Sequence, residues 1–113
     1  MTRRKILWTI HLTESAQSDF QDIVRWTAER FGPSQARSYA TTLSLALQAL
    51  TAGPAIPGAR ELDEIAPGLM TLHVARQGRK GRHFVMFRVN PREARTIDVL
   101  RILHDAMDLP EHV

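Results

Sequence analysis

The sequence predicts an α+β domain of two layers, in which a helical hairpin packs on an antiparallel sheet and the elements follow the order β-α-α-β-β-β. Apolar residues recur at helical spacing between residues 14 and 50, and after residue 69 they switch to the alternation that is typical of strands. A length of 113 residues suits one domain, so we expect residues 1–113 to form a single unit.

A first strand is predicted for residues 5–12. Alternation places Ile6, Trp8 and Ile10 on one face, and we expect Leu7 and Leu12 to lie off that face. Thr13 is a suitable N-cap and Glu14 complements the helix dipole, so a helix should begin there and run to about residue 31. Its predicted buried stripe consists of Ala16, Phe20, Ile23, Val24, Thr27 and Phe31.

Gly32 and Pro33 predict the end of this helix and the start of a second one, since glycine favours the position after a helix and proline its first turn. The second helix should span roughly residues 34–50. Its apolar stripe consists of Ala36, Tyr39, Ala40, Leu43, Ala46, Leu47 and Leu50. So short a connection predicts an antiparallel hairpin whose two stripes face one surface.

A loop rich in proline and glycine is expected over residues 53–68. Three strands then follow, at residues 69–75, 82–90 and 95–103. The middle one is apolar on both faces through most of its length, so we expect it to be covered on each side.

The charge is unevenly distributed along the chain. The formal net charge is +3, yet residues 76–101 alone hold eight basic residues against two acidic ones, which indicates a polyanionic or acidic partner. The chain has no cysteine, which excludes disulfides and thiolate chemistry and fits a reducing compartment. Because no run is apolar enough for export or for a membrane span, we expect a cytoplasmic protein without a membrane partner.

Several motifs together resemble the ParE-type toxins of the RelE/ParE superfamily. They are Ser15-Ala16-x-x-Asp19-Phe20-x-x-Ile23-x-x-Trp26-Thr27, Phe31-Gly32-x-x-x-Ala36-x-x-Tyr39, Pro67-Gly68-Leu69, Phe84-Val85-Met86-Phe87-Arg88-Val89, and Val99-Leu100-Arg101-Ile102-Leu103-His104-x-x-Met107-Asp108-x-x-x-His112. The resemblance covers nearly the whole chain in order. The C-terminal run matches most closely.

This resemblance implies the toxin of a type II toxin–antitoxin pair, with the two-layer fold just described and a ParD-like antitoxin that wraps and neutralises it. Growth arrest and plasmid stabilisation are the outcomes it implies. ParE members of the superfamily inhibit DNA gyrase, whereas RelE members cut mRNA on the ribosome. Three functions therefore remain open: a gyrase inhibitor that acts by binding, a ribosome-dependent endoribonuclease, and a non-toxic relative that binds only an antitoxin.

The residues favour the inhibitor over the nuclease. RNA cleavage without a metal needs a base, an acid and cations around the phosphate. The RelE-like nucleases of the superfamily supply arginine, lysine and often a C-terminal tyrosine for these roles. The one tyrosine in this chain, Tyr39, belongs to the second predicted helix. If the chain is a nuclease, the candidate catalytic residues are Arg82, His83, Arg88 and His104. If it is an inhibitor, no catalytic residue is expected.

Two sets of contact residues are predicted. The target-binding set lies in the basic stretch around residues 76–82, in the last predicted strand and in the segment that follows it. Its members are Arg76, Arg79, Lys80, Arg82, Arg101, His104, Met107, Asp108 and His112. Each of them also has a purely structural interpretation; Arg101, for example, could pair with an acidic group inside the fold. The weaker antitoxin-binding set consists of Leu7, Leu12 and Leu45.

No cofactor or metal is predicted. His104 and Asp108 would share a helical face, but no third ligand stands at ligand spacing. No recognition-helix pattern accompanies the basic segment, so sequence-specific binding of nucleic acid is not expected.

Overall fold

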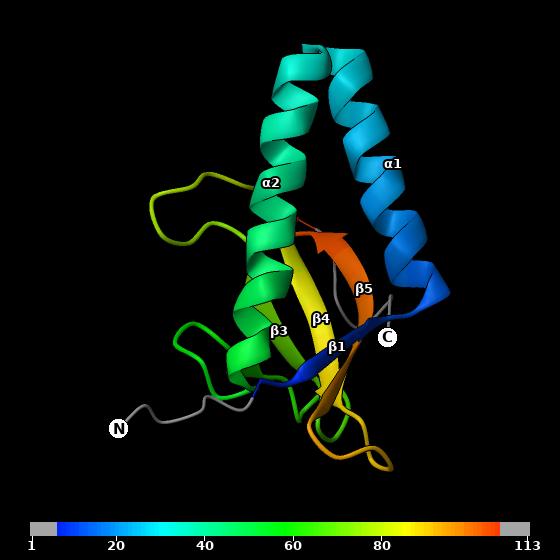
Figure 1. The fold of residues 1–113 in the computed structure, drawn as a ribbon, viewed down its shortest axis with the longest axis vertical. Helices are drawn as coiled ribbons and strands as arrows, with labels where there is room; N and C mark the ends of the chain where they lie inside the picture. The colour runs from blue at the N-terminus through cyan, green and yellow to red at the C-terminus, as the bar shows by residue number, and fades with distance from the viewer. Residues whose placement is uncertain (1–6, 107–113) are drawn as a thin grey trace.

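The computed structural model of the protein describes residues 7–106, and the structural statements below concern this part of the chain. The elements are β1 Thr9–Leu12, α1 Glu14–Phe31, α2 Pro33–Ala49, the 3-10 turn η1 Leu50–Ala52, β2 Arg60–Glu61, β3 Met70–His73, β4 His83–Val89 and β5 Thr96–His104. In Figure 1 the helical hairpin covers one face of the sheet, and its far end extends beyond the strands. The predicted two-layer α+β fold is confirmed.

The sheet is mixed. Its strand order is β1-β5-β4-β3-β2. Neighbouring strands from β2 to β5 pair antiparallel, whereas β1 pairs parallel to β5, with Ile10 opposite Ile97. The expectation of an antiparallel sheet is therefore wrong for β1. Side chains alternate with the same period in both kinds of strand, so the sequence pattern carries no signal for direction.

The helix boundaries follow the predicted signals to within one residue. The Thr13 hydroxyl accepts a hydrogen bond from the Ala16 amide at 3.1 Å and donates one to the Leu100 carbonyl at 3.0 Å, so the cap also joins α1 to β5. Gly32 separates the helices with a φ of 91°, a conformation that favours glycine, and Pro33 begins α2.

The expected loop over residues 53–68 contains a short strand that the sequence did not predict. Arg60 and Glu61 of β2 pair with Thr71 and Met70 of β3. Both β2 side chains are exposed. The strand therefore consists of backbone pairing alone, and no apolar alternation marks it in the sequence.

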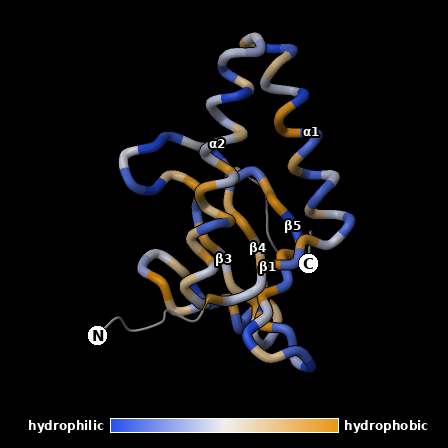
Figure 2. Tube along the Cα trace, viewed as in Figure 1, coloured by the Kyte–Doolittle hydropathy of each residue, from blue (hydrophilic) through white to orange (hydrophobic). Residues whose placement is uncertain are grey.

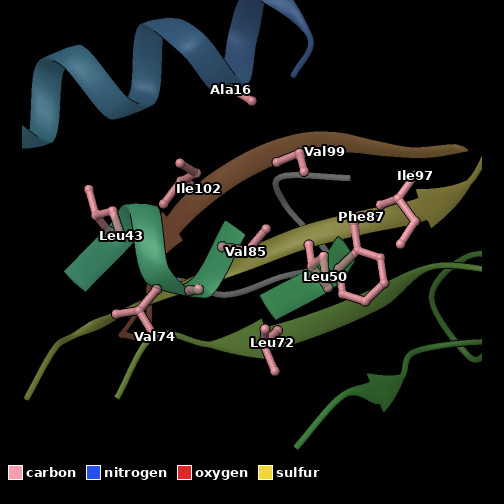
Figure 3. Packing of buried hydrophobic residues seen from close by; sticks show 11 residues of the cluster. Ala16, Leu43, Leu50, Leu72, Val74, Val85, Phe87, Ile97, Val99 and Ile102 are labelled. Carbon is pink, nitrogen blue, oxygen red and sulfur yellow. The ribbon is translucent and has the colours of Figure 1, made fainter. Parts of the chain in front are cut away.

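Apolar side chains pack on both faces of β4, as predicted. Figure 3 shows the main core, where Leu43 of α2 and Leu50 of η1 lie against Val85 and Phe87 of β4. A smaller cluster lies apart from this core. It consists of Leu69, Phe84, Met86 and Leu103, with Leu62, Ile65, Ala66 and Leu100 packed against it.

Two expected positions of apolar side chains are wrong. Leu12 packs against the main core together with Trp8 and Ile10, because it is an even number of residues from both and so shares their face. Phe31 was expected in the buried stripe but is 62% exposed, because α1 ends on the part of the hairpin that extends beyond the sheet. Neither described helix is long and apolar enough to cross a membrane.

Candidate functional site: a groove between the hairpin and the basic loop

A groove of about 980 Å³ opens where the helical hairpin meets the loop between β3 and β4. Side chains of α1 and α2, the loop, and the ends of β4 and β5 line it. We call this loop, residues 74–82, the basic loop; Figure 1 shows it reaching out beside α2, and its tip is hydrophilic in Figure 2. The groove therefore unites residues that lie far apart in the sequence.

The basic loop is held against α2. The Arg79 guanidinium donates to the Thr42 hydroxyl at 2.8 Å and to the Ser38 carbonyl at 2.9 Å. Gly81 allows a close approach, since a Cβ on this residue would stand 2.5 Å from a methyl carbon of Val74. The hydrogen bonds of Arg79 thus position the loop on the helix.

Tyr39 joins the loop to the sheet. Its hydroxyl accepts a hydrogen bond from the Arg82 amide at 3.0 Å and lies 2.6 Å from Nδ1 of His83. We assign the hydroxyl proton to this second hydrogen bond. A neutral His83 consequently carries its proton on Nε2. Burial chiefly, followed by the neighbouring His104, lowers the pKa of His83 from 6.5 to about 4. His83 is therefore uncharged near neutral pH. Burial also raises the pKa of Tyr39 above 10.0.

A polar cluster adjoins the groove around Asp105. One carboxylate oxygen of Asp105 lies 3.0 Å from Nε2 of His73, and the other lies 3.4 Å from Nε of Arg82 and 3.6 Å from Nδ1 of His104. The hydrogen bond from His73 is the main reason why the pKa of Asp105 is lowered below 3.8. The His104 ring stands edge-on to the His83 ring, with 5.2 Å between their centroids.

The four candidate nuclease residues do not converge on one site. Arg82, His83 and His104 line the groove, but Arg88 does not. Arg88 is five residues along β4 from His83, roughly 17 Å away, and alternation directs it to the other face. There its Nε lies 3.7 Å from the Asp98 carboxylate.

Several predicted target-binding residues are engaged inside the fold. Arg76 donates to the Pro57 carbonyl at 3.3 Å, and Arg79 is bound to α2 as described. Arg101 forms a two-point ion pair with Asp19 at 2.7 and 3.0 Å, as its structural interpretation anticipated. Lys80, Arg82 and His104 line the groove, and the side chain of Arg82 is 74% exposed. Met107, Asp108 and His112 lie outside the described residues.

The three leucines of the predicted antitoxin-binding set differ in exposure. Leu7 is 57% exposed and Leu45 is 45% exposed, as an anchor for a partner requires, but Leu12 packs against the core. No three histidine, cysteine, aspartate or glutamate side chains within residues 7–106 gather closely enough to hold a metal ion.

Sequence reasoning missed three aromatic residues of the groove, namely Trp26, Phe31 and Tyr39. Tyr39 and Phe31 were attributed to buried helical stripes, and Trp26 served only as part of a motif. A signal existed for Trp26, since a large aromatic residue lay off the predicted apolar stripe of α1. No signal in the sequence alone indicated that the hairpin would extend beyond the sheet.

Comparison with known proteins agrees with this architecture. The family model described as the ParE toxin of the type II toxin–antitoxin system, parDE, matches residues 10–109. Toxin ParE1 of Mycobacterium tuberculosis is 34% identical over 102 residues, which cover 90% of this chain and 94% of the relative. Toxin ParE of Escherichia coli is 32% identical over 98 residues, covering 87% and 85%.

Solved structures support the fold. A chain of the chromosomal ParDE TA system from P. aeruginosa superposes with a TM-score of 0.64 at 23% identity, over 86% of this chain and 95% of that one. A chain of the RelBE2 toxin–antitoxin complex from Mycobacterium tuberculosis gives a TM-score of 0.59 at 19% identity, over 88% and 99%. With the match over residues 10–109 and the two curated relatives, the chain belongs to the ParE family of toxins of type II toxin–antitoxin systems.

Proposed function

We propose that this toxin inhibits DNA gyrase by binding to it in the cytoplasm, without chemical catalysis, and that a ParD-like antitoxin neutralises it. Membership of the ParE family carries this proposal, because the resemblance described above links ParE toxins to gyrase and RelE toxins to mRNA. The solved relatives come from ParDE and RelBE toxin–antitoxin systems, which supports an antitoxin as the second partner.

The geometry of the groove agrees better with binding than with RNA cleavage. A nuclease needs a base that accepts a proton readily, yet the pKa of His83 is lowered to about 4 and its Nδ1 is engaged by the Tyr39 hydroxyl. Arg88 stands on the other face of the sheet, beside Asp98, and so cannot add its charge to the groove. Lys80 and Arg82 remain as exposed cations for contact with an acidic target surface.

One experiment separates the three functions. The purified chain is added to gyrase in a supercoiling assay, and the ends of cellular mRNA are mapped after its expression. Loss of supercoiling with intact transcripts is the expected result. Ribosome-dependent cuts in mRNA would replace the proposal with the nuclease. Normal growth with neither effect would leave a relative that only binds an antitoxin.

A pair of charge reversals sharpens this test. Lys80→Glu combined with Arg82→Glu should weaken gyrase inhibition at least tenfold, because both cations lie in the groove. Arg92→Glu combined with Arg95→Glu is the matched control, since both arginines are exposed in the turn after β4, at the other end of the sheet. If both variants inhibit gyrase equally well, the basic loop is not part of the contact with gyrase.

A further inference from the structure

We propose that the groove binds single-stranded nucleic acid, with unpaired bases stacked on Trp26 and Phe31 and the phosphates held by Lys80 and Arg82. This is binding alone, and no bond is made or broken. The proposal uses the same two cations as the proposed gyrase contact, but oligonucleotide binding is measured without gyrase, so the two proposals can fail separately.

The lining of the groove is rich in flat rings. Five of its side chains are aromatic or imidazole: Trp26, Phe31, Tyr39, His83 and His104. Ile23 is the only branched aliphatic side chain among the described residues that line it. A groove for an amphipathic helix presents aliphatic pockets at helical spacing, whereas a channel for single strands combines rings with cations. The composition of this groove favours the nucleic acid.

Two of the rings are exposed to an unusual degree. Trp26 is 52% exposed and Phe31 is 62% exposed. They contact each other edge to face, with 5.9 Å between ring centroids, and the Arg30 guanidinium lies 5.2 Å from the centroid of the Trp26 ring. Exposed aromatic surface of this size is costly in water, and covering it with bases would remove that cost.

Cations stand in the same groove as these rings. Lys80 is exposed, and the Arg82 side chain reaches only a 3.4 Å contact with Asp105, so both are available to phosphates. Arg79 adds its charge from its fixed position on α2. Asp22 is the one carboxylate among the described lining residues, and Arg25 lies 3.5 Å from it. The groove therefore has a positive balance, which complements a polyanion.

Single strands fit this arrangement better than a duplex. Stacking requires a free base face, and in a duplex the faces are hidden within the stack. Stacking on a ring does not distinguish one base from another, so the binding should tolerate any sequence. This agrees with the absence of a recognition-helix pattern in the chain.

Fluorescence of Trp26 offers a direct test. The chain has two tryptophans, and Trp8→Phe leaves Trp26 as the sole reporter. Oligothymidylate and oligouridylate of roughly twelve nucleotides, a duplex of the same length, and polyglutamate of the same charge are titrated in turn. We expect saturable quenching by the two single strands, whose relative affinities show whether DNA or RNA is preferred, and little effect from the duplex or polyglutamate.

Two variants locate the site, with anisotropy of a labelled oligonucleotide as the readout. Trp26→Ala should weaken binding roughly tenfold or more through lost stacking. Lys80→Ala should reduce the slope of log affinity against log salt by about 0.7, the value for one phosphate contact on a single strand. Arg92→Ala is the charge-matched control and should leave the slope unchanged. All three positions are exposed, and the unfolding curve of each variant in urea verifies its fold.

Three outcomes would overturn the proposal. The first is a duplex that binds as tightly as the single strands. The second is a slope of log affinity against log salt that falls equally in Lys80→Ala and Arg92→Ala, which would indicate diffuse attraction to the whole basic surface. The third is polyglutamate that displaces the oligonucleotide at equal charge, which would make the groove a site for an acidic polypeptide.

Discussion

The hydroxyl group of Tyr39 connects three parts of the molecule at the scale of a single residue. It belongs to α2, accepts from the backbone of the basic loop at Arg82, and donates to His83 of β4. With the hydroxyl proton assigned to the bond with Nδ1, the neutral His83 ring is protonated on Nε2.

Replacing Tyr39 with phenylalanine tests this connection. The variant keeps the ring but leaves the Arg82 amide and Nδ1 of His83 without their partner, so we expect the free energy of unfolding in urea to fall by about 1–2 kcal/mol. The nitrogen chemical shifts of His83 should also move toward a mixture of tautomers. Ser44→Ala, at an exposed position of the same helix, is the control. Unchanged His83 shifts would contradict the assigned role of the hydroxyl.

The lowered pKa of His83 predicts that the free energy of unfolding depends on pH. Its pKa is about 4 in the folded chain against an ordinary value of 6.5, so between these values the unfolded chain binds more protons than the folded one. The stability contributed by neutral His83 is therefore complete above about pH 6.5 and is lost as the pH falls toward 4. Burial and His104 both act in this direction, while Asp105 opposes it.

Urea unfolding at pH 7, 5.5 and 4.5 measures this contribution. His83→Asn keeps an acceptor for the Tyr39 hydroxyl but cannot be protonated, so its stability should fall less steeply than that of the parent chain across this window. Asp105 does not contribute to the change over this pH range. Its pKa is lowered below 3.8, so the stability that its carboxylate contributes is lost only at more acidic pH. Identical slopes for the two proteins would refute the role of His83.

The sequence alone could predict some residues of the site but not their relation. The cations of the basic loop were evident from charge, and pairing of Arg101 with an acidic residue was a recognised option. The contact between Tyr39 and His83 could not be foreseen, because the two are 44 positions apart and a helical stripe does not tell whether the polar end of a tyrosine reaches a groove.

At the scale of elements, the Asp19 carboxylate joins helix α1 to strand β5. Asp19 accepts two hydrogen bonds from the Arg101 guanidinium and a third from the Ile102 amide at 2.9 Å. Its side chain is 15% exposed and that of Arg101 is 36% exposed, so the pair is partly shielded from water. Such a pair contributes more than an ion pair on the open surface.

Asp19→Ala should lower the free energy of unfolding by about 1.5–3 kcal/mol, since it leaves Arg101 and the Ile102 amide unpaired. The matched control is Asp22→Ala on the same helix, whose ion pair with Arg25 is exposed on both sides and should contribute less than about 0.5 kcal/mol. A double-mutant cycle with Arg101→Ala isolates the coupling. If Asp19→Ala and Asp22→Ala lower the free energy of unfolding equally, the pair between α1 and β5 stabilises the fold no more than an exposed ion pair does.

The elements themselves were largely predictable, with instructive exceptions. Both helices and the strands β1, β3, β4 and β5 follow apolar periodicity and capping signals, which are local in sequence. Strand β2 has only two exposed residues, and the parallel direction of β1 depends on pairing with β5 some 87 residues later. Properties set by backbone pairing or by distant partners leave no local pattern to detect.

At the scale of the whole molecule, the fold separates a packed body from a projecting hairpin. The sheet and the adjoining halves of the helices share the core, whereas the far end of the hairpin has no sheet beneath it and displays Trp26 and Phe31. The basic loop stands beside the middle of α2, at Ser38 and Thr42, and forms the other wall of the groove. An open groove on a packed body suits the proposed action by binding.

The C-terminal segment provides the last test of function on this body. Strand β5 ends at His104, and the Asp105 carboxylate that follows it lies 3.0 Å from Nε2 of His73 in β3. We expect a chain that lacks residues 107–113, and with them Met107, Asp108 and His112, to unfold cooperatively in urea but to lose gyrase inhibition and growth arrest. Ser44→Ala in the chain with residues 107–113 present is a control outside this segment. If the shortened chain fails to fold, the segment is structural; if it folds and remains toxic, the target contact lies elsewhere, with the groove as the next surface to test.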